Sequence, residues 1–576
     1  MKTRLFLLSA LVGLLVAACG PTATAVVVPA ATDAPQPTQV PAAATEQPIP
    51  ATEQPTGNAA QLAFPDASAD QILRLNTGSS GQSSFTFYPM SSGGDHQSMM
   101  PFLFVPPLYF DFDLNLKPGV FSTWKANADF TSWTFTIDPR AQWSDGSKIT
   151  SADVKGTYEM MANPTTETGR IRQYLGTVEG FTDVYELKAT EITGLKIVDE
   201  TTIEFKLIKP DPVYAMRLAT THMNPLKIEN YKADPQKAWL PESNPVYSGP
   251  YMLESYDPDQ GTAVMVPNPN WWMDEGPYLS RIDIHFQPDP ELLAVELQND
   301  QVDASIGGLP FTMLPGFPDY FRTTKSFGFN AFWLSATDKP TDDINVRKAL
   351  VLAVNQEQVF KAAYPMQGEA IPATGILDPD FPCIDKENTW YKQDIEAAKA
   401  ALAASTYGSA ENLPKLRVSP RGADAGMNRA LESVVEQWRQ NLGITNVEFQ
   451  VKVDGFGEDA KLINLSRDDA VVRFPDAVTY MYVATHRDGP MAIDMMQGFD
   501  NAEINSLLES AATLSTDDPK RCEAALTAQR IFMDQYHNLF FGIVQSRLQS
   551  RAYVQNYYKG PDVGQIEPWK IYIKEH

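Results

Sequence analysis

Apolar and polar residues alternate with a period of two along several short segments of the chain. Residues 133–137 (WTFTI), 202–207 and 282–286 each follow this pattern. Such alternation is typical of a strand with one buried and one exposed face. Asp145-Gly146 lies after the first segment and predicts a turn. These segments predict a sheet in the first half of the chain.

Other segments repeat their apolar positions at helical spacing. Thr150 and Asp153 form a capping-box pattern, and Val154, Tyr158 and Met161 follow on one face. Residues 347–363 predict a single amphipathic helix, entered from Asp342-Asp343. Its inward residues would be Val346, Leu350, Val354 and Phe360.

Residues 416–453 predict a strand, a helix and a second strand in close succession. The strands are 416–418 and 447–453, and the helix between them covers 428–442. Gly443 stands where that helix should stop. Its apolar face is formed by Leu431, Val434, Val435, Trp438 and Leu442. Two strands joined through a helix by short connections imply a parallel sheet, so the body of the chain is predicted to be α/β.

The first eighteen residues are typical of an export signal. Lys2 and Arg4 precede an apolar run over 5–15, and small residues at 16–18 stand directly before Cys19. The run is too short to cross a membrane as a helix. Small residues followed by a cysteine resemble a bacterial lipobox, which implies that Cys19 is lipidated and becomes the mature N-terminus.

Residues 21–57 consist mainly of Pro, Thr, Ala, Gln and Val, and the pentapeptide ATEQP occurs twice. Proline removes backbone donors, and the segment has too little apolar surface to offset the entropy lost on ordering. We therefore expect residues 19–65 to be a lipid anchor and a disordered linker. At about 3.1 Å per residue in polyproline geometry, the linker would reach roughly 100 Å from the bilayer.

Composition and charge narrow the class of protein. The chain is 576 residues long, which favours two or more lobes in the remaining body. The formal charge is −25, and loss of Lys2 and Arg4 with the signal would change it by two units to −27. A polyanion of this size is repelled by phosphate backbones, so nucleic acid is not an expected partner. Cys383 and Cys522 remain after Cys19, and their spacing leaves open whether they form a disulfide.

Several blocks, taken in order, resemble one family of proteins. They are Trp124, 133–137, 142–146 (QWSDG), 150–154 (TSADV), 247–251 (YSGPY), 268–272 (NPNWW), Val302-Asp303, 345–350 (NVRKAL), 441–444 (NLGI) and the closing 571–576 (IYIKEH). These blocks resemble family 5 extracytoplasmic solute-binding proteins, which include the oligopeptide, dipeptide and nickel receptors of ABC importers. The similarity runs from about Ile72 to the C-terminus.

The resemblance implies an α/β, two-lobe periplasmic-binding-protein-like clamp of type II, large cluster, with an extra inserted subdomain. Residues 66–323 would form lobe one, with the inserted subdomain at about 111–185, and residues 541–576 would complete it. Lobe two would be residues 324–540. Two strands would cross between the lobes, near Phe327 and Phe541, and ligand would close the lobes by a hinge motion.

Most of the family blocks are predicted to be structural. Trp124, Trp133, Trp143 and Trp272 are expected in the core rather than as platforms for sugars. Asp145-Gly146 is expected to be a turn and not a carboxylate site.

The resemblance also places a candidate ligand segment in lobe two. Peptide-binding relatives commonly have an aromatic residue, an Asp three positions later that pairs with the peptide amine, and then Asp/Glu-Pro. Counted without gaps from Asp476, these positions fall on Tyr482, Thr485, Asp488 and Gly489. A threonine can accept a hydrogen bond from an ammonium but supplies no charge. Either Asp488 reaches the amine from a shifted loop, or the ligand has no free amine there.

Two further contacts are carried over from the family. A lobe-one loop that touches the ligand backbone maps to Ile306, Gly307 and Gly308, where glycine allows close approach. Residues Arg421 to Met427 open the predicted helix, whose N-terminus attracts carboxylate or carbonyl groups. Arg421 would pair with a carboxylate or be a solvated surface side chain; the residues leave this open.

An enzyme is the main alternative from another class. Sequences for a zinc metalloprotease, a nucleophile elbow or a phosphate-binding loop are absent from the chain. The carboxylates leave an extracytoplasmic hydrolase possible in principle. We expect a binding protein with no catalytic residue, no cofactor and no metal.

Among binding proteins, a peptide receptor comes first, an oligosaccharide receptor second, and a metal-chelate receptor, for which His486 is the candidate ligand, third. A surface scaffold for a protein partner ranks below these. The expected partners are a peptide or small-molecule ligand, an ABC permease complex and the membrane that holds the lipid anchor. The protein is expected to be a monomer, extracytoplasmic, on the periplasmic or cell-surface side.

Overall fold

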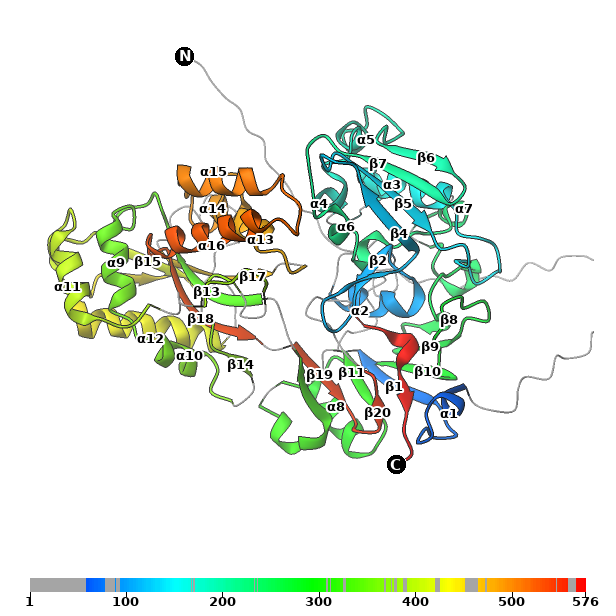
Figure 1. Cartoon of the computed structure of the whole chain (residues 1–576). Helices are drawn as coiled ribbons and strands as arrows, with labels where there is room; N and C mark the ends of the chain where they lie inside the picture. The colour runs from blue at the N-terminus through cyan, green and yellow to red at the C-terminus, as the bar shows by residue number, and fades with distance from the viewer. Residues whose placement is uncertain are drawn as a thin grey trace, which may run out of the picture. The chain divides into compact units, whose positions relative to one another are not determined.

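The computed structural model (Figure 1) describes most of the chain after residue 58. The described residues are 59–77, 89, 94–166, 168, 171–232, 234–235, 237–306, 309–310, 312–324, 328–366, 369–373, 375–377, 381–386, 391–419, 425–450, 465–471, 474–544, 546–557 and 566–576. The predicted signal, Cys19 and the predicted linker up to residue 58 lie outside them. The described parts combine helices with mixed sheets, as the predicted α/β class requires.

The first large sheet has seven strands. Its order is β12 (Phe321–Thr324), β19 (Ser546–Ser550), β11 (Ala304–Ile306), β1 (Ile72–Thr77), β10 (Arg281–Phe286), β9 (Thr262–Pro267) and β8 (Tyr251–Asp257). β1 runs parallel to β10 and β11, and the other neighbours are antiparallel. We call the elements around this sheet the first lobe.

A four-stranded antiparallel sheet belongs to the same lobe. It consists of β4 (Phe121–Ala126), β5 (Ser132–Ile137), β7 (Thr202–Lys206) and β6 (Leu195–Asp199), and its apolar side chains join the first lobe's large hydrophobic cluster. The hairpin of β2 (Leu108–Phe110) and β3 (Leu116–Pro118) precedes it. The helices of this lobe are α1 (Ala59–Ala63), α2 (Gly94–Leu103), α3 (Ser151–Ala162), α4 (Ile171–Leu175), α5 (Phe181–Tyr185), α6 (Tyr214–Arg217), α7 (Ile228–Tyr231) and α8 (Pro290–Gln298).

The second large sheet has six strands. Its order is β14 (Ala370–Ile371), β18 (Asn538–Val544), β13 (Gly328–Leu334), β17 (Leu465–Val471), β15 (Leu416–Ser419) and β16 (Val447–Phe449). The helices around it are α9 (Ile344–Leu352), α10 (Gln356–Ala363), α11 (Ile395–Ala404), α12 (Ala425–Leu442), α13 (Ala477–Thr485), α14 (Pro490–Asp494), α15 (Ala502–Ala511) and α16 (Pro519–Met533). We call these elements the second lobe.

The chain passes between the two large sheets twice. β12 is followed by β13, and β18 by β19, and the members of each pair belong to different sheets (Figure 1). The first passage lies between Thr324 and Gly328, and the second between Val544 and Ser546. The exact ranges predicted for the lobes and for the inserted subdomain stay predictions.

Local sequence signals explain several of these elements. Thr150 and Asp153 form the reciprocal capping box at the start of α3, as predicted. β15 and β16 are parallel and separated by α12, which confirms the predicted strand-helix-strand unit. The predicted tryptophan anchors Trp133, Trp143 and Trp272 are buried, whereas Trp124 is only partly buried.

Two predicted elements differ more from the structure than the others, whose ends shift by one to three residues. The single helix predicted over 347–363 is two helices, because Asn355 caps α10 by accepting from the Gln358 N–H after α9 has ended. Asp343 caps α9, so the predicted entry at 342–343 is confirmed. The strand predicted over 447–453 is shorter, since β16 ends at Phe449 and residues 451–453 lie outside the described residues.

The stretch 247–251 shows why one block has its particular residues. The Ser248 hydroxyl accepts a hydrogen bond from the Val105 N–H at 3.0 Å. Gly249 lies against the backbone of Leu103 and Phe104, where a Cβ would come within 2.4 Å of the Leu103 carbonyl carbon. The block therefore joins α2 to β8 through backbone contacts that a larger residue at 249 would break.

Candidate functional site

The parallel strands of both large sheets point their carboxyl ends toward the passages between the sheets. In the first sheet, Thr77 of β1 pairs with Ile306 of β11, and neighbouring β19 begins at Ser546, directly after a passage. In the second sheet, Val471 of β17 pairs with Gly328 of β13, which begins after the other passage. In open α/β sheets, ligands bind at the carboxyl ends of the strands. This edge is therefore the candidate ligand site.

Of the predicted contacts, Ile306 and Met427 belong to this edge by topology. Ile306 is the last residue of β11 and is 9% exposed, while Met427 lies in the first turn of α12 and is 2% exposed. Met427 packs in the second lobe's core with Leu431 and Val434. Its contact with a ligand would therefore require a rearrangement of this first turn. Gly307 and Arg421 lie outside the described residues.

Thr485 offers no surface to a ligand in this structure. It is the last residue of α13, its side chain is fully buried, and its hydroxyl donates to the Met481 carbonyl at 2.7 Å. This bond to the preceding turn satisfies the hydroxyl within the helix. Of the three positions predicted in the segment 482–488, Tyr482 and Asp488 retain exposed surface, whereas Thr485 does not.

The loop after α13 is organised around His486. The Asp488 N–H donates to His486 Nδ1 at 3.1 Å, so Nε2 carries the proton in the neutral ring and donates to Glu509 Oε1 at 3.2 Å. The Tyr482 ring stacks on the imidazole with centroids 4.0 Å apart and planes at 12°. His486 is itself buried. It therefore holds the loop in place and is not available to a ligand.

Asp488 supplies the exposed carboxylate of this loop. Its carboxylate is 73% exposed and lies 3.8 Å from His486 Nδ1, which in the neutral tautomer is an acceptor and not a partner. The hydrogen bond from His486 and the nearby Arg487 lower the pKa of Glu509. The Glu509 carboxylate therefore already has partners within the protein. Burial and the carboxylates of Asp488 and Glu509 raise the pKa of Tyr482. The loop thus presents an aromatic ring and a carboxylate, a combination suited to a cationic group.

The position of α13 is set by a buried ion pair. Asp476 caps the helix by accepting from the Thr479 N–H, and it also receives two hydrogen bonds from Arg521 of α16, at 3.2 and 2.8 Å. Both side chains are nearly excluded from solvent, at 11% and 5% exposure. A buried pair with such geometry fixes the register of two helices against each other.

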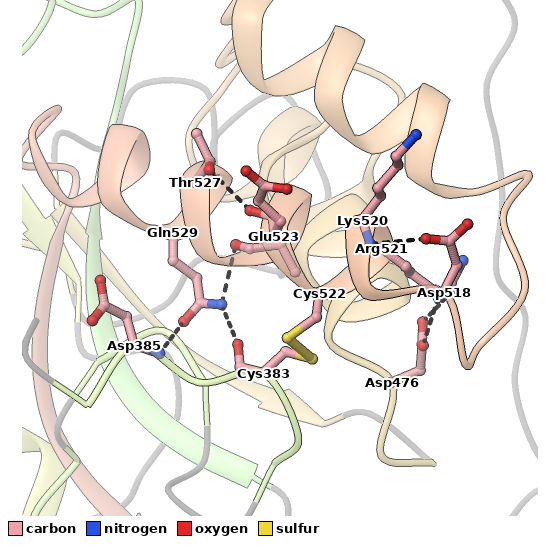
Figure 2. The surroundings of a disulfide bond; sticks show 11 residues. Cys383, Asp385, Asp476, Asp518, Lys520, Arg521, Cys522, Glu523, Thr527 and Gln529 are labelled. Atoms are coloured by element: carbon pink, nitrogen blue, oxygen red, sulfur yellow. Dashed lines mark hydrogen bonds and ion pairs between the residues drawn. A yellow bond between two sulfur atoms is a disulfide. The ribbon is translucent and has the colours of Figure 1, made fainter.

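A disulfide stands beside that pair (Figure 2). Cys522 follows Arg521 on α16 and is bonded to Cys383, with Cα atoms 5.3 Å apart. Gln529 reinforces the joint, because its amide donates to the Cys383 carbonyl at 2.8 Å and accepts from the Asp385 N–H at 3.1 Å. The question left open by the cysteine spacing is thereby answered: segment 381–386 is held on α16.

Two residues at the candidate edge carry no signal in the sequence. Phe474 follows the end of β17, and its ring lies over the guanidinium of Arg217 in the first lobe, 5.6 Å from the guanidinium carbon. Neither residue belongs to a spacing pattern that predicts this contact.

Within the described residues, no group of three or more His, Cys, Asp or Glu side chains could hold a metal ion. None of the described helices is long and apolar enough to cross a membrane.

Comparison with known proteins gives the family. Residues 115–491 match the model of the bacterial extracellular solute-binding proteins, family 5. The oligopeptide-binding protein OppA of Bacillus subtilis is 24% identical over 441 residues, which cover 73% of this chain and 78% of that protein. The known relatives of this kind are binding proteins.

Solved structures show a similar fold. The open, unliganded murein tripeptide-binding protein MppA has a TM-score of 0.74 at 20% identity, covering 88% of this chain and 98% of that one. Haemophilus influenzae OppA in complex with the peptide RPPGFSPFR has a TM-score of 0.65 at 19% identity, covering 88% of this chain and 100% of that one. The two large sheets with their two passages form the two-lobe α/β clamp of these proteins, and the chain belongs to family 5 of the bacterial extracellular solute-binding proteins.

Proposed function

We propose that the protein is the substrate-binding lipoprotein of an ABC importer, and that it captures a peptide between its two lobes and delivers it to a membrane permease. The observation that carries the proposal is the family match across residues 115–491, together with relatives named for oligopeptide binding. A similar solved protein from Borrelia burgdorferi is named as part of an oligopeptide ABC transporter. The proposal that the ligand is a peptide rests on the names of these relatives.

The loop 486–489 supports a ligand with a positive group. Asp488 is exposed, and its carboxylate lies near enough to Tyr482 that, besides burial, it raises the pKa of that hydroxyl. An ammonium that approached there would gain a charge-assisted hydrogen bond with Asp488 and a contact with the face of an aromatic ring. We assign the ligand amine to Asp488 and not to Thr485, whose hydroxyl is bonded inside the helix.

The tryptophans do not favour the oligosaccharide alternative. Nine of the ten tryptophans lie in the described part of the chain, and seven of these are buried while Trp124 and Trp271 are half-buried. A sugar platform requires an exposed aromatic face. We therefore do not propose an oligosaccharide receptor, and binding of oligosaccharides is an alternative outcome of the test below.

The test is thermal unfolding of the full-length protein in detergent, after unfolding and refolding to remove carried-over ligand. Peptides of two to nine residues, the same peptides with an acetylated amine, oligosaccharides and nickel chelates are added in turn. A ligand at a hundredfold excess over its Kd should add about 2.7 kcal/mol to the free energy of unfolding. A shift with free peptides alone supports the proposal, and a shift with sugars or chelates alone overturns the peptide assignment.

The assignment of the amine is tested with Asp488→Asn. Loss of a charge-assisted hydrogen bond should weaken binding of a free-amine peptide about 10- to 100-fold and leave the acetylated peptide unchanged. Asp517→Asn, which removes an exposed carboxylate elsewhere in the second lobe, is the matched control. Equal affinities for the two variants would move the amine site away from Asp488.

The anchor is tested separately. Cys19→Ser should release the protein from membranes and abolish incorporation of labelled fatty acid, because acyl chains at this residue are proposed to supply the attachment. A variant that stays membrane-bound and acylated would refute the anchor without touching the binding role.

A further inference from the structure

Phe474 belongs to the second lobe by its place in the chain but packs in the first. It lies three residues after β17 ends and two before Asp476, which caps α13. Its side chain is 7% exposed and forms part of the hydrophobic cluster built on the first lobe's sheets. A residue of one lobe buried in the core of the other is a contact that lobe opening would have to break.

The first lobe holds the side chain that this ring contacts, Arg217, in a fixed position. Arg217 Nε donates to Asp211 Oδ2 at 2.6 Å, and Asp211 is nearly buried. The other oxygen of Asp211 accepts from the Val213 N–H at 3.1 Å, and the Asp211 carbonyl accepts from Trp133 Nε1 at 3.1 Å. The guanidinium is therefore fixed by its partners before the ring meets it, so little side-chain entropy is lost when the contact forms.

A second apolar contact runs in the opposite direction. Leu114 lies in the turn between β2 and β3 of the first lobe, with φ at +67°, and its N–H donates to the Asp111 carbonyl. Its side chain packs against the second lobe's cluster that contains Tyr480 and Met481 of α13. Each lobe thus places an apolar side chain on a main cluster of the other, and Met366 of the second lobe also packs against the smaller first-lobe cluster around α8.

We propose that Phe474 is a closing latch: seated on Arg217 in the first lobe, with Leu114 as its counterpart, it holds the two lobes together without ligand. Because the latch follows the carboxyl end of β17, it lies at the candidate ligand edge. A ligand would then bind a protein that already spends much of its time closed, and its apparent affinity would rise with the closed fraction.

The latch is tested on the full-length chain with Cys19→Ser, so that the only free thiols are two introduced ones, Asp183→Cys in α5 and Ser506→Cys in α15. Both positions are exposed, and Cys383 and Cys522 are bonded to each other. Spin labels on the two cysteines report the distance between the lobes in the absence of ligand. Phe474→Ala should shift this distance distribution away from that of the parent protein. An unchanged distribution would overturn the proposal.

Phe449→Ala is the matched control, because Phe449 is an exposed aromatic at the end of edge strand β16. It should leave the distribution unchanged; a shift equal to that of Phe474→Ala would mean that the labels report something other than the latch, and would count against it. If Phe474→Ala does not fold, Phe474→Leu decides: it keeps an apolar side chain but removes the ring from Arg217, and should give a smaller shift in the same direction. No shift with a folded Phe474→Leu would then overturn the proposal.

The affinity measurement rests on the proposed function, and the distance measurement does not. With a peptide that binds the parent protein, Phe474→Ala should weaken affinity about tenfold, which corresponds to about 1.4 kcal/mol. If no peptide binds the parent protein, the peptide assignment fails while the ligand-free distances still decide the latch. A wider distance distribution with unchanged peptide affinity would overturn the link between the latch and binding.

Discussion

At the scale of the residue, glycine in the block 247–251 is required by contact and not by backbone conformation. The Gly249 N–H donates to the Leu103 carbonyl at 2.8 Å, and a Cβ at this position would lie 2.4–2.7 Å from backbone atoms of Leu103 and Phe104. Backbone atoms cannot move aside as the end of a flexible side chain can. The whole junction of α2 with β8 would have to separate.

Gly249→Ala is therefore expected to lower the free energy of unfolding by about 3 kcal/mol. The measurement is urea unfolding followed by circular dichroism. Gly316→Ala is the control, because no atom lies within 4 Å of the position of its Cβ. Equal midpoints for the two variants would show that the junction yields more easily than its geometry indicates.

His537 makes a second prediction at this scale. Burial, with a smaller effect from Arg347, lowers its pKa from 6.5 to about 3 in the folded protein. The unfolded chain then binds the proton first as the pH falls, so this histidine contributes full stability above pH 6.5 and loses it progressively toward pH 3. Between pH 7 and pH 5 the loss should be about 2 kcal/mol.

His537→Gln removes the titrating group but keeps a donor for the Leu334 carbonyl, which the ring nitrogen Nδ1 contacts at 3.0 Å. Between pH 7 and pH 5, the free energy of unfolding should fall by about 2 kcal/mol less in the variant than in the parent protein. Parallel pH profiles would contradict the buried neutral ring.

At the scale of the element, sequence patterns predicted best where local interactions decide. The capping box of α3 and the apolar face of α12 are set by residues three or four positions apart, and both are as predicted. The single helix over 347–363 was wrong because helical periodicity continues on both sides of Asn355, although α9 ends at Leu352 and Asn355 caps the next helix.

Contacts between distant elements carried no comparable signal. The seat of Phe474 on Arg217 joins residues far apart in the chain, and the pairing of Cys383 with Cys522 spans 139 positions. Thr485 shows the same limit in the ligand segment. Its place in the chain suggested a contact, but whether a residue near the end of a helix faces a ligand or the core depends on how the helix packs.

The disulfide gives the prediction that belongs to the elements it joins. It closes a loop of 139 residues and holds segment 381–386 on α16, next to the Arg521 that fixes α13. Replacing both cysteines with serine should destabilise the second lobe by about 2–5 kcal/mol, since the unfolded chain regains the freedom that the bond removes. Urea unfolding of the double variant would measure this, with the parent protein under reductant as a check. Unchanged midpoints would show that Gln529 and the ion pair suffice.

At the scale of the whole molecule, the hydrophobic clusters are divided between the lobes. One large cluster is built on the first lobe's sheets, while two others lie within residues 331–543. In the described part of the chain, two strand passages connect the large sheets, and three apolar side chains pack on clusters of the opposite lobe: Phe474, Leu114 and Met366. Such a division favours lobes that unfold as separate units.

Calorimetry of the ligand-free protein should therefore show two transitions, and a reductant should lower only the one that belongs to the second lobe, because the disulfide lies wholly within it. A saturating ligand that contacts both lobes should raise both transitions and bring them together, since unfolding either lobe then also costs the binding free energy. Phe474→Ala, by removing a contact between the lobes, should separate the ligand-free transitions further. A single transition whose calorimetric and van't Hoff enthalpies agree would show instead that the lobes already unfold as one unit without ligand, and that the few contacts between them couple the two cores fully.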